Sequence, residues 1–325
     1  MSGSSRITVI GGGVIGLSCA VRLAQGGADV DVVAKAYSPR TTSDIAAAVW
    51  YPFRAGPREA VARWAVRTYD VLVAIAGGEP SAGVALVDGR EYAHEPLPSE
   101  PWHDHVLAFR PLDAAETPPP FRCGIAFRAP VVAMPRYLAW LRERATALGV
   151  RFGEAEVTAG DLADRLAAGA TIVQATGLGA RELVGDGSMY AIRGQIVRVA
   201  PGRTDRFVQA TRPPQPVTYV IPRPDCTVLG GTTDVGPEDL AVDADEAAAI
   251  VARCTALVPS LAGAAVLSHA VGLRPGRDGV RLEAEALGGG RIIHCYGHGG
   301  AGVTLSWGCA EDVAALALGA AASDG

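Results

Sequence analysis

A glycine-rich turn near the start of the chain has the residue types and the spacing of a dinucleotide-binding site. Gly11, Gly13 and Gly16 follow the apolar run 6–10 (RITVI), typical of a buried strand, and apolar residues at helical spacing continue over 17–24. In a G-x-G-x-x-G turn the first glycine permits the tight bend, the second admits a pyrophosphate, and the third lets helix and strand pack closely. The N–H groups and the positive end of the helix then attract phosphate. We therefore predict that this turn binds a dinucleotide.

The position that normally holds the ribose of such a dinucleotide is unusual. A second strand, 29–34 (DVDVVA), completes a βαβ unit within the first 34 residues. An acidic residue is expected near the end of that strand, where it binds the ribose hydroxyls. Lys35 stands about there in this chain. A basic residue is compatible with a ribose 2′-phosphate, so the motif alone leaves FAD and NADP open.

The sequence shows no pattern typical of a metal site or of an activated nucleophile. His294, Cys295 and His298 are close together, but their spacing matches no zinc pattern, and we predict no metal. No Ser-His-Asp arrangement stands out. The cysteines form no C-x-x-C pair, so free thiols are expected, while a disulfide among the last four stays open. The six are Cys19, Cys123, Cys226, Cys254, Cys295 and Cys309.

The elements that must position these residues alternate between helices and strands. Helical patterns are predicted over 58–76, 136–148, 243–257 and 303–318. A buried strand is predicted over 171–175, and further strands over 195–199, 218–221, 227–229, 266–273, 280–283 and 291–296. Short strands separated by turns favour an antiparallel sheet. The predicted fold class is therefore α/β, with an antiparallel part inserted.

Composition and charge exclude several classes of function. The chain has 325 residues, of which 49% are hydrophobic and 19% charged, as expected of a globular protein with about two domains. The formal charge of -5 and the absence of a Lys/Arg-rich run give no indication of a basic surface that would bind nucleic acid. No stretch approaches the roughly 18 apolar residues of a membrane span, and the N-terminus lacks a secretory pattern. We expect a cytoplasmic protein with small-molecule partners.

Five further segments carry a family resemblance. They are 41–52 (TTSDIAAAVWYP), 193–196 (RGQI), 219–222 (YVIP), 271–275 (VGLRP) with 280–283 (VRLE), and 294–304 (HCYGHGGAGVT) with 307–309 (WGC). In content and order they resemble the D-amino acid oxidase family, which includes the D-aspartate oxidases. The resemblance implies FAD as the cofactor, and a Rossmann-like FAD-binding domain with an inserted antiparallel-sheet substrate domain. The implied boundaries are 1–52, 136–192 and 268–325 for the FAD domain, and 53–135 and 193–267 for the substrate domain.

The resemblance also implies roles for single residues. Arg274 and Tyr219 would hold the substrate carboxylate, and the backbone carbonyl of Gly300 would lie near the amino group. An arginine offers a planar fork of donors that matches a carboxylate, and a tyrosine adds one donor on a stiff side chain. The expected neighbours of FAD are Gly11, Gly13, Val14, Ile15, Gly16, Lys35, Thr41, Thr42, Ser43, Ala47, Ala48, Val49, Val157, Thr176, Arg274, Gly299, Gly300, Gly302, Val303 and Thr304.

The reaction implied by the resemblance is hydride transfer from the substrate α-carbon to the flavin, with oxygen as the final acceptor. The products would be hydrogen peroxide and an imino acid, which hydrolyses to a keto acid and ammonia. No general base is needed if the amine is bound neutral. The helix that begins near Thr304 would place positive potential beside the flavin pyrimidine, where negative charge grows on reduction.

Several alternatives stay open at this stage. A D-aspartate oxidase or a glycine-type amine oxidase belongs to the same chemistry, and an acidic substrate would need a second cation, for which Arg54 and Arg212 are available. A non-catalytic flavin or NADP module is disfavoured, because it need not keep Arg274 and Tyr219. The short segment 212–218 stands where mammalian-type enzymes have a longer lid with a second tyrosine, and Gln215 is nearest to that tyrosine. A homodimer is also left open.

Overall fold

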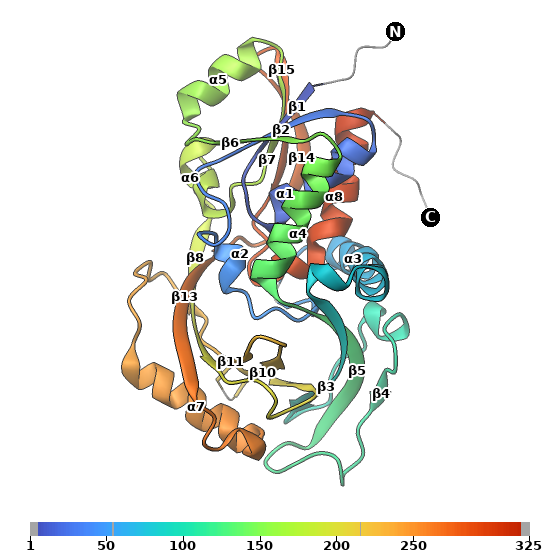
Figure 1. Cartoon of the computed structure of the whole chain (residues 1–325), viewed down its shortest axis with the longest axis vertical. Helices are drawn as coiled ribbons and strands as arrows, with labels where there is room; N and C mark the ends of the chain where they lie inside the picture. Colours follow the sequence, from blue (N-terminus) through green and yellow to red (C-terminus); the bar gives the residue numbers. More distant parts are fainter. Residues whose placement is uncertain (1–5, 54, 215, 320–325) are drawn as a thin grey trace.

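The chain folds around two β-sheets, which lie one above the other in Figure 1. The computed structural model describes residues 6–53, 55–214 and 216–319, so the predictions made for Arg54 and Gln215 fall outside the described residues. The predicted α/β class is confirmed, with a mainly parallel sheet and a mainly antiparallel one. The domain boundaries stay a prediction.

The first sheet has the order β14-β15-β7-β1-β2-β6. Its neighbours are paired in parallel except at the edge, where β14 runs antiparallel to β15. The strands are β1 (Arg6–Ile10), β2 (Asp29–Ala34), β6 (Arg151–Glu154), β7 (Thr171–Gln174), β14 (Arg281–Leu287) and β15 (Gly290–Tyr296). Parallel neighbours need crossover connections, and here helices supply several of them.

Helices cover both faces of the first sheet (Figure 1). On one side lie α1 (Val14–Gln25), α4 (Met134–Ala147) and α8 (Gly302–Leu318), with α3 (Arg58–Gly78) packed against α8. On the other side lie α5 (Ala159–Ala167) and α6 (Ala180–Leu183). Consecutive strand residues therefore pack into different clusters, as Ile172 and Val173 do. Burial of both faces explains why the central strands β1 (RITVI) and β7 (TIVQ) are mainly apolar, whereas β2 (DVDVVA) alternates in burial.

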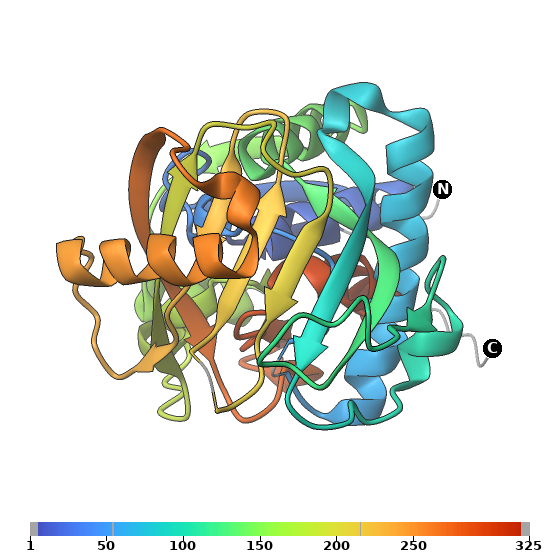
Figure 2. The ribbon, with the colours of Figure 1, turned by 90° about the horizontal axis from the view of Figure 1, so that it is seen from below.

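Within the described residues the second sheet has nine strands, in the order β12-β8-β11-β10-β9-β3-β5-β4, with β13 also paired to β8. The strands are β3 (Val84–Ala93), β4 (Arg110–Pro111), β5 (Cys123–Val132), β8 (Tyr190–Val199), β9 (Phe207–Ala210), β10 (Thr218–Pro222), β11 (Thr227–Gly230), β12 (Asp234–Val235) and β13 (Val266–Gly276). The pairs are antiparallel, apart from β3 with β9. Helix α7 (Ala244–Leu257) crosses the outer face (Figure 2), where Ile250 packs on Val220 and Leu229.

A short segment joins the two sheets beside the glycine turn. It contains α2 (Thr42–Ile45) and residues 46–53, and a bridge between Val49 and Val131 ties it to the second sheet.

The four helices predicted over 58–76, 136–148, 243–257 and 303–318 are present with small shifts of their ends. The helical spacing over 17–24 belongs to α1, which begins earlier, at Val14. Helix α5 was not predicted, although Thr158 and Asp161 form a capping box at its start. Among the helices of the described residues, none has the length and apolar content needed to cross a membrane.

Candidate functional site

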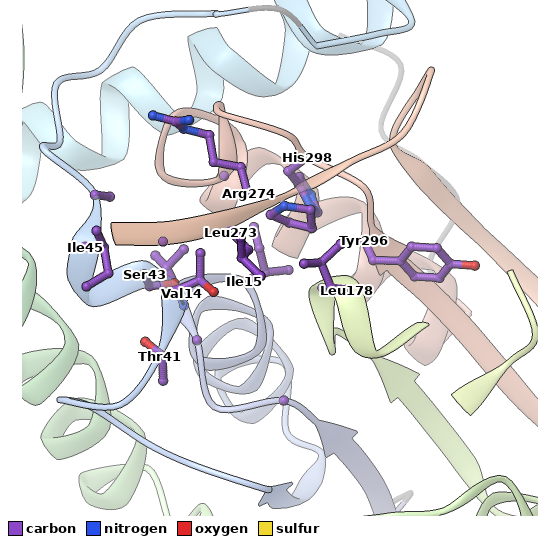
Figure 3. Close-up of a pocket in the computed structure, with 18 of the residues that line it drawn as sticks. Val14, Ile15, Thr41, Ser43, Ile45, Leu178, Leu273, Arg274, Tyr296 and His298 are labelled. Atoms are coloured by element: carbon purple, nitrogen blue, oxygen red, sulfur yellow. Dashed lines mark hydrogen bonds between the residues drawn. The ribbon is translucent and has the colours of Figure 1, made fainter. Parts of the chain in front are cut away.

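A cavity of about 950 Å³ lies between the two sheets. Its walls come from the glycine turn, the 40–53 segment, the inner face of the second sheet and the start of α8. The volume is that of a site for a large organic ligand. Figure 3 shows Val14, Thr41 and Ser43 close together in its wall, with the Arg274 side chain pointing away from them.

The glycine turn forms one end of the cavity. Gly11 has φ +132°, and a Cβ there would lie 2.3 Å from the carbonyl oxygen of Ala175. A Cβ on Gly16 would lie 2.0 Å from the carbonyl oxygen of Gly11, so α1 can pack directly on the turn. Gly13 is the N-cap of α1 and provides no side-chain cap. The N–H of Val14 is bonded to the Ser43 hydroxyl, and the following N–H groups of the first turn, from Ile15 on, are left for a ligand in the cavity, as a phosphate site requires.

The segment after β2 is held against this turn by a buried carboxylate. Asp44 accepts hydrogen bonds from the backbone N–H and the hydroxyl of Thr41, at 2.9 and 2.6 Å. The hydroxyl of Ser43 accepts from the N–H of Val14 at 3.0 Å. Thr41, Thr42 and Ser43 line the cavity as a result. Thr41 and Ser43 are thereby fixed by contacts within the protein itself.

An acidic residue does stand beside Lys35, but it follows a different strand. Lys35 forms an ion pair of 2.9 Å with Glu156, two residues beyond the end of β6. Both residues line the cavity and both are exposed. Because Glu156 lies 121 residues further along the chain, the fingerprint around β2 could not identify it. The pairing of β2 with β6 is what brings it there.

The start of α8 forms another wall of the cavity. Gly299, Gly300, Gly302 and Val303 line it, and Ala301 is an N-cap without a side-chain hydrogen bond. Thr304 also lines the cavity, but its hydroxyl is used by the backbone of Tyr51. It donates to the carbonyl at 3.0 Å and accepts from the N–H at 3.1 Å. The positive end of a 17-residue helix thus faces the ligand space.

Arg274 and Tyr219 lie together on the inner face of the second sheet. The Nη1 of Arg274 donates to the carbonyl of Thr232 at 3.0 Å. Burial raises the pKa of the Tyr219 hydroxyl, and the charge of Arg274 opposes that shift. Tyr219 therefore stays a protonated donor beside a cation. Both residues line the cavity, which makes this corner suited to a carboxylate.

Two glycines make room for this pair of side chains. A Cβ on Gly194 would lie 2.2 Å from Nη1 of Arg274, and a Cβ on Gly230 would lie 2.0 Å from the Tyr219 ring. A glycine inside a strand often marks such a close approach. The resemblance pointed to the segment around Gly194, but no sequence pattern explained why a glycine stands there.

Polar residues gather beside Tyr219, and of these Glu91 and Gln209 were not predicted as part of the site, whereas Arg212 was a candidate cation. Tyr51 and Gln209 line the cavity, and the Tyr51 hydroxyl donates to Glu91 at 2.9 Å. Glu91 is only 1% exposed, and it pairs with Arg212 at 3.3 Å. The candidate cation Arg212 is therefore neutralised by a buried carboxylate. No sequence pattern signals this pair, because it joins β3 to the residues after β9.

Cys295, His298 and Cys309 come together behind the cavity, with their ligand atoms within 4.8 Å of one another. Two of them, Cys295 and His298, line the cavity. Sequence spacing did not indicate this cluster, because Cys309 belongs to α8. Burial raises the pKa of Cys309 and lowers the pKa of His298 to about 4, so both groups are uncharged near neutral pH. All six cysteines are free thiols.

The structure gathers the predicted site residues around one cavity. Arg274, Tyr219, Gly300 and every other predicted FAD neighbour line it, except Gly16, which supports the turn from behind. The start of α8 without a side-chain cap, the start of α1 where Ser43 bonds only the N–H of Val14, the glycine turn without room for a Cβ, and the volume all fit a dinucleotide. The contacts of single residues with that ligand stay predictions.

Comparisons with known proteins agree with this picture. Residues 6–316 match the model of a family described as FAD dependent oxidoreductase. The chain is 48% identical to a D-amino-acid oxidase of Rubrobacter xylanophilus, with 96% of each chain covered. It is 36% identical to the human D-aspartate oxidase, over 96% of this chain and 94% of that one. The fold resembles the crystal structure of glycine oxidase from Geobacillus kaustophilus, with a TM-score of 0.79 at 20% identity, covering 98% and 96%.

Proposed function

The chain belongs to the FAD-dependent oxidoreductase family, and from this premise we propose that it oxidises D-amino acids with oxygen. One hydride leaves the substrate α-carbon and one proton leaves the amino group, giving an imino acid, while oxygen takes up both and becomes hydrogen peroxide. Water then converts the imino acid to a keto acid and ammonia. The paired Arg274 and Tyr219, in the wall of a cavity that fits a dinucleotide, are the observation that carries the proposal. The match to the D-amino-acid oxidase of Rubrobacter xylanophilus supports it.

FAD would lie with its pyrophosphate at the start of α1. The N–H groups beyond Gly13 would bind the phosphates, and Thr41 to Ser43 would contact them from the opposite side. We assign the ribose contact to Glu156, with Lys35 orienting its carboxylate through their ion pair. The start of α8 would face the flavin ring. When bound, the flavin supplies the hydride acceptor and the route of electrons to oxygen.

The protein's own contribution is mainly the positioning of the substrate. Arg274 would bind the carboxylate through two donors, and the Tyr219 hydroxyl would add a third. The Gly300 carbonyl would accept a hydrogen bond from the amino group, which fixes the direction of the α-hydrogen. We assign the choice of the D form to these three contacts, because they decide which substituent points at the flavin. The second sheet forms one wall of the cavity and would shield the bound substrate from part of the bulk water.

Oxygen uptake by the FAD-loaded enzyme tests the proposal. With D-alanine we expect oxygen consumption, with one peroxide formed per oxygen, and with L-alanine we expect none. Oxidation of L-alanine at a similar rate, or the absence of turnover with any D-amino acid, would contradict it. A cytoplasmic location and a homodimer remain predictions of the sequence.

A further inference from the structure

We propose that Asp186 is a positioning residue, which fixes the end of β13, with Arg274, relative to the turn after β15, with Gly300. The inference deepens the proposed function and rests on it. It assigns the alignment of the two candidate substrate contacts to a carboxylate that does not line the cavity. Neither the glycine fingerprint nor the family resemblance pointed to Asp186.

Asp186 lies where the chain passes from the first sheet to the second. It follows α6 and precedes β8, whose first residue, Tyr190, pairs with Gly276 at the end of β13. From here β8 and β13 run side by side into the second sheet (Figure 1). On the other side, Met189 shares a buried cluster with Tyr296, the last residue of β15 in the first sheet. Asp186 therefore stands at the joint between the two sheets.

The carboxylate of Asp186 accepts hydrogen bonds from three parts of the chain. Oδ2 accepts from the Tyr296 hydroxyl at 2.9 Å and from Nε of Arg277 at 3.1 Å. Oδ1 accepts from the backbone N–H and the hydroxyl of Ser188, at 2.9 and 2.5 Å. Burial alone would raise the pKa of Asp186, but these donors outweigh it and hold the pKa well below its usual range. The carboxylate is therefore charged near neutral pH, with both oxygens occupied.

Arg277 ties the end of β13 to the turn after β15. Its side chain lies over Gly297, where a Cβ would be 2.9 Å from the Arg277 Cβ. Nearby, the carbonyl of Pro275 accepts a hydrogen bond from the N–H of Gly299 at 2.8 Å. The residue before Pro275 and the residue after Gly299 are the two candidate substrate contacts. Those contacts therefore stand on segments that are bonded to each other and held by one ion pair.

Tyr296 ties the same carboxylate to the first sheet. Tyr296 lines the cavity, but its ring points away from the other labelled residues and carries the hydroxyl to Asp186 (Figure 3). The hydroxyl oxygen also accepts from Nη1 of Arg281 at 2.9 Å, which fixes the ring further. One carboxylate thus holds the last residue of β15 and the turn after β13 in a single arrangement.

The relative placement of the two sheets decides how well the reacting groups meet. FAD would lie against the first sheet and the start of α8, whereas Arg274 and Tyr219 would hold the substrate on the second sheet. A misplacement of about 1 Å can lower a rate by about 100-fold. Loss of the Asp186 contacts would permit such a shift without removing any group that touches the substrate. The expected signature is a slower reaction with substrate binding mostly retained.

Asp186→Asn tests this role, with Asp312→Asn as the matched control. Asp312, on α8, also accepts from three side chains, those of Arg63, Trp64 and Arg67. The two carboxylates are 10% and 21% exposed, so both changes remove a largely buried charge, and both should lower Tm. In the FAD-loaded enzyme, only Asp186→Asn should lower the rate of anaerobic flavin reduction by D-alanine, by about 10- to 100-fold, while the Kd for D-alanine changes by less than about threefold.

Tyr296→Phe provides a second variant in case Asp186→Asn does not fold. It removes only the hydroxyl and should lower the same rate to a smaller extent. In the Asp186→Asn background its effect should be weaker, because the hydroxyl has lost its charged partner. A folded, FAD-loaded Asp186→Asn with the wild-type reduction rate, an equal loss in Asp312→Asn, or effects of Asp186→Asn and Tyr296→Phe that simply multiply would overturn the inference.

Visible circular dichroism of the bound flavin separates this inference from the proposed function. The flavin ring is achiral, so its signal reports its placement among the groups of the cavity wall, without turnover. We expect a changed spectrum in Asp186→Asn and an unchanged one in Asp312→Asn. If the wild type oxidises no D-amino acid, the proposed function fails and the spectrum decides. A change confined to Asp186→Asn then supports the positioning role, and no change overturns it as well.

Discussion

The most direct perturbation of the carboxylate-binding pair is a single methyl group on Gly194. In Gly194→Ala the new Cβ would lie 2.2 Å from Nη1 and 2.4 Å from Nη2 of Arg274, so the guanidinium must move. The obstacle is the far end of a flexible side chain, and the backbone of β8 can stay where it is. The change therefore displaces the candidate substrate cation without removing it.

The magnitude follows from the bonds that this movement breaks. One charge-assisted hydrogen bond contributes about 1.5–3 kcal/mol, and about 1.4 kcal/mol corresponds to a factor of ten. Loss of one such bond to the substrate carboxylate should therefore raise KM for D-alanine by about 10- to 150-fold. Because the lost contact also orients the α-carbon, we expect kcat to fall as well. Arg274 also loses its bond to the Thr232 carbonyl, so a small decrease in Tm is expected.

The assay is steady-state oxygen uptake, together with flavin content and Tm. The control is Gly153→Ala on β6, where a Cβ would meet nothing within 4 Å. It should keep the KM and the flavin content of the wild type. A folded, FAD-loaded Gly194→Ala enzyme with a wild-type KM would refute the assignment of Arg274 to the substrate carboxylate.

Three further predictions concern the cofactor end and the buried core. In Gly16→Ala the Cβ would lie 2.0 Å from the backbone oxygen of Gly11, which cannot move aside, so the purified protein should have lost most of its flavin; retained absorbance would contradict this. Glu156→Gln should weaken FAD binding by about tenfold, measured by titration of the apoprotein, whereas Lys35→Met should have a smaller effect. Burial lowers the pKa of His298 from 6.5 to about 4, so the unfolded chain takes up a proton first as the pH falls. The stability that this residue contributes is complete above about pH 6.5 and is lost as the pH falls toward 4. The loss is about 2 kcal/mol between pH 7 and 5, and denaturant unfolding of His298→Gln should show a weaker pH dependence.

The parts of the site that the sequence predicted are those formed by residues close together in the chain. The turn from Gly11 to Gly16 lies within one βαβ unit, so its spacing alone indicates its use. The central strands β1 and β7 of the first sheet are short, mainly apolar runs, which made them predictable, and the alternation of helical and strand patterns along the chain made the α/β class predictable. Arg274 and Tyr219 were found through a resemblance, because no spacing rule links two residues on β13 and β10.

The parts that the sequence missed depend on pairing between distant strands. Glu156 reaches the end of β2 because β6 pairs with β2, and Glu91 meets Gln209 because β3 pairs with β9. Cys309 joins Cys295 through the packing of α8. Gly194 and Gly230 are needed only because the side chains of Arg274 and Tyr219 lie directly over them. In each case the sequence shows the type of the residue, but the tertiary fold decides which other residues it contacts.

The measurement that tests the central claim most directly is an anaerobic titration of the FAD-loaded protein with D-alanine and with L-alanine, followed by flavin absorbance. Without oxygen the reduced flavin cannot return to its oxidised form, so each hydride transferred is seen as lost absorbance. We predict complete bleaching by one equivalent of D-alanine and none by L-alanine. A yellow protein that no amino acid bleaches, or a colourless protein that cannot bind added FAD, would contradict the account.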